Sequence, residues 1–380
     1  MSRLVFKVRS EARYATSSFP LKLRPLEDEL LSSWLIRLAL LHRTVPSTFA
    51  NLYLPETKNK LWAADIDLQA CPDFLAALSQ KSGIPIEHFQ AMTLKSYEGY
   101  LFEKARTKTG GTPFVNPLGM RGRRNKLPGV RFCPLCLREG PLPYFRKKWR
   151  LSFYVACSDH HSFLLDRCQE CGVPITPYVA CTNGHFGTCH ACGKGITGQG
   201  DGDPASTEIL AVVRKLQAIL SAGYVLIAGA PIYSHLYFIV LHQMLKLLMS
   251  RKYGESLCAA LGIACPSVDG KRSFEAVAIN SQAQLLIGAA RLLEDWPTRF
   301  VHICGQQGIL SSRLFKDLRT IPFWYWKVVV ENLYRPDRVV TDEEICAALR
   351  YMECEGMAVS ELALSRLLGV RQVFRKRKQF

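Results

Sequence analysis

The sequence lacks a long uninterrupted apolar run, which argues against a membrane-spanning protein. Its most apolar stretch, residues 223–249, contains Pro231, Ser234, two histidines and Lys246, so we interpret it as a buried helix pair broken near Pro231. The first thirteen residues carry five charges and no apolar segment, which argues against secretion. Their Arg- and Ser-containing pattern leaves a mitochondrial transit peptide open as an alternative.

Signatures of common catalytic sites are also missing. The sequence contains no GxxxxGK[ST], no GxSxG and no HExxH. Acidic residues number 32 against 49 Lys and Arg, and none forms a triplet suited to a two-metal nuclease. We therefore expect a protein that is not an enzyme. Isolated histidines in apolar helical stretches are interpreted as core or surface residues rather than ligands: His42, His88, His235, His242 and His302.

Positive charge is concentrated in three segments of a chain whose net charge is +17. Residues 1–24 carry +5, residues 121–150 carry +9 and residues 362–380 carry +6, so the remainder carries −3. Clustered positive charge on a nearly neutral body predicts a polyanionic partner, either nucleic acid or an anionic surface.

Cysteine is likewise clustered, with eight of the fourteen cysteines between positions 133 and 192. In a chain without a secretory start, such cysteines are reduced thiols, and paired thiols are metal ligands. The spacing forms two successive sets, each a CxxC followed by a loop and a second CxxC or CxxH, and this matches zinc ribbons. The sequence predicts two structural Zn²⁺ ions per chain, held by Cys133, Cys136, Cys157 and His160, and by Cys168, Cys171, Cys189 and Cys192.

The spacing leaves some details of this zinc assignment open. A cross-brace pairing of the two sets satisfies the same spacing, and His161, Cys181, His185 or His190 could replace an assigned ligand. Gly172 and Gly193 follow the second ligand of their pairs, as expected for a knuckle with unusual backbone angles. Because the module offers few other core residues, we expect metal binding to supply its folding energy.

Basic and aromatic residues alternate in residues 144–153, a pattern typical of nucleic-acid grooves. The alternative is that the rings pack against the zinc knuckles and the cations form a solvated face.

The C-terminus resembles a helix-turn-helix, because a helix capped by Ser360 is followed by a turn at Gly369-Val370 and then by a basic segment. The alternative is a solvated basic tail. The predicted nucleic-acid contacts are Arg121, Arg123, Arg124, Lys126, Arg146, Lys147, Lys148, Arg371, Arg375 and Lys376.

Helical periodicity covers most of the rest of the chain and predicts a mainly α fold. A helix with acids in its first turn is expected from Glu27, and Ser47 is expected to cap the next. The polar side of the first helix, with Arg37, is expected to face a partner. The predicted divisions are a basic arm (1–24), a helical domain with helix-turn-helix-like elements (25–105), a basic Gly/Pro-rich loop (106–130), a double zinc-ribbon module (131–197) and a helical C-terminal domain (205–380) with a helix-turn-helix at 341–380.

These residues together resemble the TniQ/TnsD family of transposition target-selection proteins. The likeness runs through Arg24–Ala39, the Phe132-Cys-Pro-Leu-Cys-Leu segment, Tyr144–Leu151, Cys157-Ser-Asp-His and Cys168-Gln-Glu-Cys-Gly. It covers residues 20–200, whereas beyond residue 207 only the helical character is similar. TnsD-type members have a longer C-terminal region, so the likeness is to a TniQ-type member.

The resemblance implies a non-catalytic adaptor in the bacterial cytoplasm that bridges a target-recognition complex to an AAA+ transposition regulator. In CRISPR-associated transposons the recognition complex is an RNA-guided effector with its guide RNA, and one sequence does not decide whether this chain serves such an element. DNA is an expected partner, and a homodimer is compatible with the pattern. The alternative function is a sequence-specific DNA-binding transcriptional regulator with structural zinc.

Four aromatic residues in succession, from Phe323 to Trp326, cannot all be buried on one helical face. At least one ring is expected to lie against a second helical layer or against another chain. We therefore expect the C-terminal half to self-associate or to dock on an effector, and the N-terminal half to recruit the ATPase.

Overall fold

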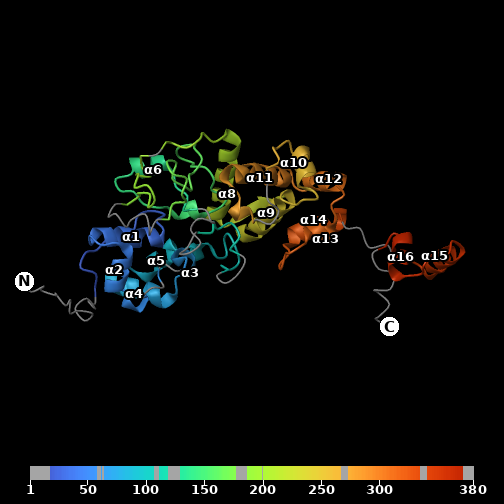
Figure 1. Ribbon diagram of the computed structural model, residues 1–380, viewed down its shortest axis with the longest axis horizontal. Coiled ribbons are helices and arrows are strands. Elements are labelled where there is room, and N and C mark those ends of the chain that lie inside the picture. Colours follow the sequence, from blue (N-terminus) through green and yellow to red (C-terminus); the bar gives the residue numbers. More distant parts are fainter. Residues whose placement is uncertain are drawn as a thin grey trace, which may run out of the picture.

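The computed structural model is mainly helical, as the periodicity predicts, and its N-terminal helices and its last helices lie at opposite ends of the long axis of the molecule (Figure 1). It describes residues 18–370 except 58–60, 62–63, 107–110, 119–128, 177–185, 199, 267–272 and 334–339. Within these described ranges, no helix has the length and apolar character needed to cross a membrane.

The N-terminal part is a bundle of short helices with its own apolar core. Trp34 is fully buried and its ring meets Phe89 edge-on, with centroids 5.0 Å apart. Gly83 ends a helix in the left-handed region (φ 74°), as its position in the sequence predicts. The elements are α1 (Leu31–Leu41), α2 (Pro46–Tyr53), η1 (Pro55–Thr57), α3 (Ile66–Gln69), α4 (Pro72–Ser82), α5 (Ile86–Met92) and η2 (Leu94–Tyr97).

Two helix starts in this bundle differ from the prediction. Helix α1 begins at Leu31 and has no acidic residue in its first turn, because Glu27 and Asp28 lie in a turn and Glu29 forms a β-bridge with Arg146. Helix α2 begins at Pro46, whose fixed φ suits the first helical position, so Ser47 lies inside the helix and does not cap it.

The central part of the chain, residues 98–206, contains little regular structure. Only α6 (Pro134–Glu139) and η3 (Lys147–Arg150) are helical among its described residues, and isolated β-bridges such as Phe132–Leu165 and Ala156–Phe163 connect its loops. Buried rings nevertheless fill it, since Phe132, Trp149 and Phe153 are all fully inaccessible to solvent. This core is larger than the sequence interpretation allowed.

The C-terminal half returns to longer helices around a shared core. Ser206 caps its first helix, accepting a hydrogen bond from the Ile209 backbone N–H. The elements are α8 (Thr207–Ala222), β1 (Tyr224–Ile227), β2 (Ala230–Tyr233), α9 (Ser234–Leu248), α10 (Gly254–Ala260), η4 (Phe274–Ala276), α11 (Ile279–Leu293), α12 (Thr298–Gln306), α13 (Ser311–Leu314) and α14 (Phe323–Leu333).

The apolar stretch at 223–249 is not the predicted helix pair. Its first part is an antiparallel hairpin of β1 and β2, in which Tyr224 faces Tyr233 across the ladder. Ala228 and Gly229 both have positive φ (49° and 81°), as a tight hairpin turn requires. Pro231 lies in a strand of this two-stranded ribbon, where both strands are edges. The second part is the helix α9.

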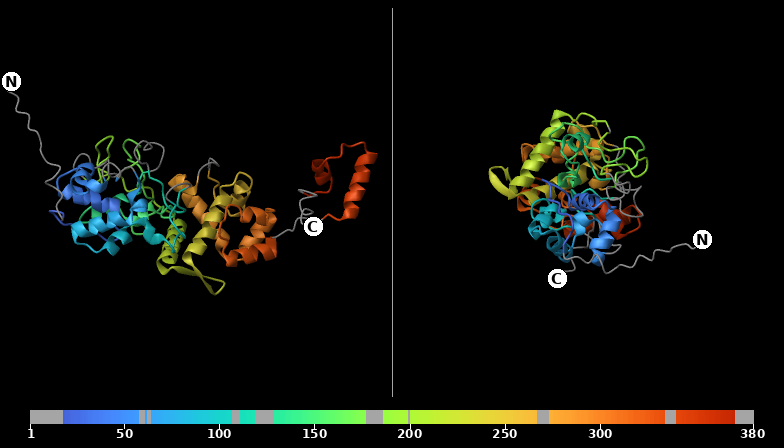
Figure 2. Two further views of the ribbon diagram at one scale, coloured as in Figure 1. Left: turned by 90° about the horizontal axis from the view of Figure 1, so that it is seen from below. Right: turned by 90° about the vertical axis from the view of Figure 1, so that its left-hand side faces the viewer.

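Three groups of buried residues account for the core. One belongs to the N-terminal bundle, and the largest joins the central part to the C-terminal helices, for example through Phe153 stacked on Phe238 with centroids 5.6 Å apart. The third, around Met352, holds only α15 (Asp342–Cys354) and α16 (Glu361–Leu367), which stand apart from the other elements (Figure 2). Thr341 and Glu344 form the predicted capping box of α15.

Candidate metal centres and their setting

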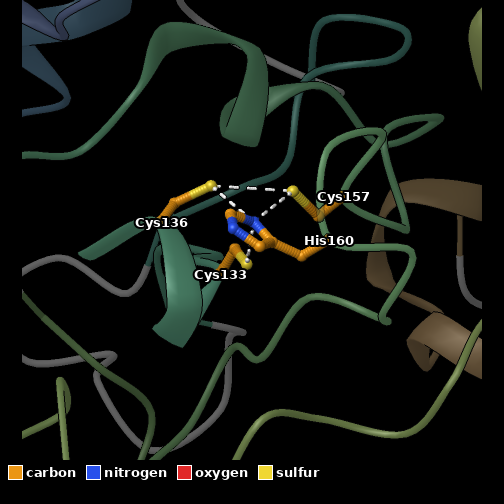
Figure 3. Close-up of side chains that lie close together, drawn as sticks. All are labelled: Cys133, Cys136, Cys157 and His160. Atoms are coloured by element: carbon orange, nitrogen blue, oxygen red, sulfur yellow. Dashed lines mark hydrogen bonds between the residues drawn. The ribbon is translucent and has the colours of Figure 1, made fainter. Parts of the chain in front are cut away.

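Cys133, Cys136, Cys157 and His160 bring four ligand atoms together in the central part of the molecule (Figure 3). Cys133 immediately precedes α6 and Cys136 lies on its first turn, so a tight helical start aims both sulfurs at one point. The other two residues come from the loop after Val155. All four ligand atoms lie within 4.8 Å of one another.

The distances in this first tetrad match tetrahedral coordination. Zn–S bonds of about 2.3 Å and Zn–N bonds of about 2.0 Å require S···S edges near ~3.8 Å and S···N edges near ~3.5 Å. The Cys136 and Cys157 sulfurs are 3.6 Å apart, and His160 Nδ1 lies 3.3–3.5 Å from the three sulfurs. The site could therefore hold one metal ion with no ligand position left open.

Glu139 at the end of α6 orients the histidine of this tetrad. Its Oε2 lies 2.6 Å from Nε2 of His160, which leaves Nδ1 directed at the sulfurs. A carboxylate on the second ring nitrogen is the usual device that fixes the tautomer of a metal-binding histidine. Nothing in the sequence spacing singled out Glu139, because its role depends on the path of the loop that carries His160.

The thiols of the first tetrad perturb one another. Hydrogen bonds from the Cys133 and Cys136 thiols lower the pKa of Cys157, whereas the neighbouring sulfurs raise the pKa of Cys136. One sulfur is therefore stabilised as a thiolate by the other two. Binding a divalent cation there would release the remaining thiol protons.

Cys168, Cys171, Cys189 and Cys192 form a second tetrad of the same kind. The Cys168–Cys192 and Cys171–Cys189 sulfur pairs are each 3.6 Å apart. The eight side chains thus group in sequence order and not as a cross-brace. Gly172 and Gly193 complete the two knuckles of this tetrad, each with a φ of 71°. Their backbone N–H groups donate to the carbonyls of Cys168 and Cys189, respectively.

The two tetrads differ in their surroundings. In the first, all three cysteines are buried within the large aromatic core, whereas Cys171 and Cys192 of the second are exposed. Metal binding is therefore not the only source of folding energy for the first tetrad, contrary to the sequence interpretation. Among the alternative ligands, Cys181 and His185 lie outside the described residues, and His161 and His190 belong to neither tetrad.

The segment 144–151 docks directly on the start of α1. Phe145 accepts a backbone hydrogen bond from Leu30 (3.0 Å) and donates its own N–H to Ser33 Oγ (3.0 Å). The Lys147 N–H donates to the carbonyl of Asp28 (2.6 Å). Two stretches that are far apart in the sequence therefore form one interface, which couples the N-terminal bundle to the first tetrad.

A buried ion pair lies at this interface. Arg37 Nη1 donates to both carboxylate oxygens of Glu29, at 2.9 and 2.7 Å, and Ser33 Oγ donates to the same carboxylate. Only 9% of Arg37 is exposed. The expectation that Arg37 faces a partner is therefore wrong, because its charge is used inside the domain.

Arg150, at the end of the segment 144–151, links this segment to α3 through ion pairs. Its guanidinium is completely buried and contacts Asp65 at 2.5 Å and Asp67 at 3.2 Å. Asp67 also accepts hydrogen bonds from the backbone N–H and hydroxyl of Ser32. Burial raises the pKa of Asp67 to about 6, although the Arg150 charge opposes the shift. Buried charges of this kind need partners that offset their desolvation, and the sequence pattern did not reveal these partners.

The predicted nucleic-acid residues fall into two groups. Arg121, Arg123, Arg124, Lys126, Arg371, Arg375 and Lys376 lie outside the described residues. The others make contacts within the protein, and the aromatic residues between them, including Phe145 and Trp149, are buried. Arg146 lies 3.5 Å from Asp159, Lys148 lies 3.8 Å from the same carboxylate, and Lys147 Nζ donates to the Ala91 carbonyl and to Ser96 Oγ.

Comparison with known proteins agrees with this architecture. Residues 20–164 match the TniQ family model, which spans the N-terminal bundle, the docked segment 144–151 and the whole first tetrad. No curated protein matches the chain significantly. The match therefore identifies residues 20–164 as a TniQ domain.

Proposed function

We propose that the protein is a non-catalytic target-site selection adaptor in DNA transposition, bridging a target-recognition complex to an AAA+ transposition regulator. The observation that carries the proposal is the TniQ match over residues 20–164. The matched region contains the buried Glu29–Arg37 pair and the Arg150 contacts. Buried contacts of this kind suit a protein that transmits position and orientation between partners.

The two tetrads act as structural zinc sites in this proposal. Four protein ligands leave no open coordination position for a substrate or an activated water. Three cysteines with one histidine, and four cysteines, are donor sets that suit Zn²⁺. The ions would hold the loops of the central part against the α1 interface and supply no reaction chemistry.

Exposed aromatic residues on α14 support a protein-binding role for the C-terminal half. Tyr325 is buried and Trp324 packs on Trp296 with centroids 4.8 Å apart. Phe323 and Trp326 remain 71% and 42% exposed, with their rings stacked 5.9 Å apart. Exposed aromatic pairs are typical of interface anchors, so we assign to α14 docking on the effector or on a second copy of the chain.

We assign recruitment of the AAA+ regulator to the N-terminal bundle. A pull-down of the purified chain against the AAA+ ATPase, transposase and effector encoded near its gene tests the assignment. The adaptor role predicts that the ATPase and the effector are retained together only when the chain is present. Sequence-specific DNA binding without any of these partners would favour a transcriptional regulator. A CRISPR effector among the neighbouring genes would identify the recognition complex as RNA-guided.

A further inference from the structure

A basic groove lies in the C-terminal half, outside the region that matches the TniQ family. Its volume is about 810 Å³, and it opens between the end of α9, the turn before α10, and α13 with the loop that follows. Five cationic residues line it, together with one acidic residue, Asp317, so the lining carries four more positive charges than negative ones. The cations are Lys246, Arg251, Lys252, Arg313 and Lys316.

Among the described residues, these five cations form no ion pair with a carboxylate. Nearby arginines of the same half do find carboxylates: Arg291 pairs with Glu208 at 2.7 Å and Arg299 with Glu294 at 2.6 Å. The carboxylate of Glu275, close to the groove, is already used by His242 at 2.9 Å and by the Phe114 N–H. Among the residues that the structure describes, no carboxylate pairs with the cations of the groove.

The walls of the groove are fixed in place. Gln243, buried on α9, donates its side-chain amide to the carbonyls of Arg313 (3.4 Å) and Lys316 (3.2 Å). This pair of hydrogen bonds holds the α13 loop against α9 and keeps the cations of the two walls facing one concave surface. Buried Phe274 and Tyr253 form part of its lining.

A simpler interpretation is a solvated charged face. Lys246, in the last turn of α9, is favoured there by the helix dipole alone. That explanation does not extend to Arg313 and Lys316, which come from a different part of the chain and converge on the same concavity. Cations that line a concave surface focus the electrostatic field and attract polyanions.

We propose that this groove binds the phosphate backbone of DNA without reading its sequence. Duplex DNA carries a negative charge for every ~1.7 Å of its axis, so one backbone passing through the groove would meet several of the five cations. Serine hydroxyls at Ser250, Ser273 and Ser312 line the same surface and can donate to phosphate oxygens. The choice of DNA over other polyanions rests on the proposed function, whereas the anion-binding character of the groove does not.

The test compares two triple variants of the full chain with equal charge loss. Lys246→Gln, Lys252→Gln and Lys316→Gln neutralise the groove. Three exposed lysines elsewhere provide the matched control: Lys104→Gln, Lys215→Gln and Lys327→Gln. Binding of a random-sequence duplex is measured by fluorescence anisotropy over a range of salt concentrations, with metal content and circular dichroism confirming that both variants fold.

The groove variant should bind at least about tenfold more weakly than wild type at ~0.1 M salt, and its salt slope should fall by up to ~2.7. The control variant should stay within about twofold of wild type. Equal losses in the two variants, no DNA binding by the wild type, or a clear preference for RNA of equal length would each overturn the proposal. None of these readouts requires transposition, so failure of the groove is distinguishable from failure of the adaptor role.

Lysine acetylation of the wild-type chain gives an independent readout that needs no substitution. With saturating duplex present, Lys246, Lys252 and Lys316 should become protected, as detected by mass spectrometry. Lys104, Lys215 and Lys327 should react as they do in the free protein. Equal reactivity of the groove lysines with and without DNA would contradict the assignment.

Discussion

Buried charges determine how the TniQ domain is joined together. Glu29, Arg37 and Arg150 carry charges, which usually lie in solvent, yet each is buried with hydrogen-bonding partners. Such groups contribute little net stability compared with apolar residues, but removing one partner leaves the other uncompensated. They specify a single way of docking the α1 start on the segment 144–151.

Arg37→Ala should destabilise the protein by about 3–5 kcal/mol, because it leaves the buried Glu29 carboxylate without its cation. Burial already raises the pKa of Glu29, and the Arg37 hydrogen bonds oppose that shift. Urea denaturation measures the change. Arg350→Ala, at an exposed position of α15, is the control and should change the free energy of unfolding by less than about 0.5 kcal/mol. A similar small effect of Arg37→Ala would show that the pair is dispensable.

Glu275→Gln should have a pH-dependent effect. Burial would raise the pKa of Glu275, but the hydrogen bond and charge of His242 and the Phe114 N–H outweigh it, so the pKa lies below its ordinary value of 4.5. A carboxylate with a lowered folded pKa stabilises the protein fully above the unfolded pKa and loses this contribution as pH falls through the folded pKa.

The stability difference between wild type and Glu275→Gln should therefore be about 1–3 kcal/mol at pH 7 and shrink as pH falls below about 4.5. Denaturant midpoints of both proteins between pH 7 and pH 4 measure it. The exposed Glu353→Gln variant controls for general charge effects. A difference that grows toward low pH would contradict the assignment of the Glu275 pKa.

At the scale of single elements, local signals predicted some features well. The CxxC and CxxH spacings identified the residues that the structure gathers into tetrads, and Gly83 and Thr341 marked a helix end and a helix start correctly. These signals succeed because a knuckle or a cap depends on residues within a few positions of one another.

Features that depend on contacts distant in sequence were missed. The β1–β2 hairpin was interpreted as helix because an apolar run alone does not distinguish the two. The basic groove was not predicted from the sequence, because its cations are spread from position 246 to 316 in a part of the chain without a charge cluster. The partner of Arg37 was missed since Glu29 lies before the helix and folds back onto it.

With zinc in both tetrads, as we propose, Cys171→Ser should remove one of the two ions and loosen the second tetrad only. Its cysteines are partly exposed, whereas the first tetrad is supported by the aromatic core around Trp149. Because metal binding and local folding are coupled, limited proteolysis should begin near residues 168–196 while the TniQ domain stays intact. Elemental analysis that finds fewer than two zinc ions in the untreated protein would contradict this assignment.

Phe323→Ser with Trp326→Ser should weaken association through α14 while leaving the fold unchanged. Truncating two exposed anchor residues of an interface costs about 2 kcal/mol or more, roughly a thirtyfold loss of affinity. Sedimentation velocity, with and without the effector, measures the association. Tyr351→Ser, an exposed aromatic on α15, is the control. Unchanged association of the double variant would move the docking surface away from α14.

At the scale of the whole molecule, the parts of the chain lie along one long axis (Figure 2). The TniQ domain and the first tetrad are at one end, and the groove and the exposed aromatic pair of α14 lie in the half that follows. Shared core residues connect the central part to the C-terminal helices. This arrangement suits a protein that holds several partners at set positions.

Mapping of transposon insertion sites tests the adaptor role most directly. Insertions are sequenced from cells that carry the complete element and from cells that carry the element without this chain. The adaptor role predicts insertions at the selected target with the wild-type chain, loss of that target without it, and a purified chain that shows no nuclease or strand-transfer activity. Insertions that keep the same target in the absence of the chain, or strand transfer by the isolated protein, would contradict it.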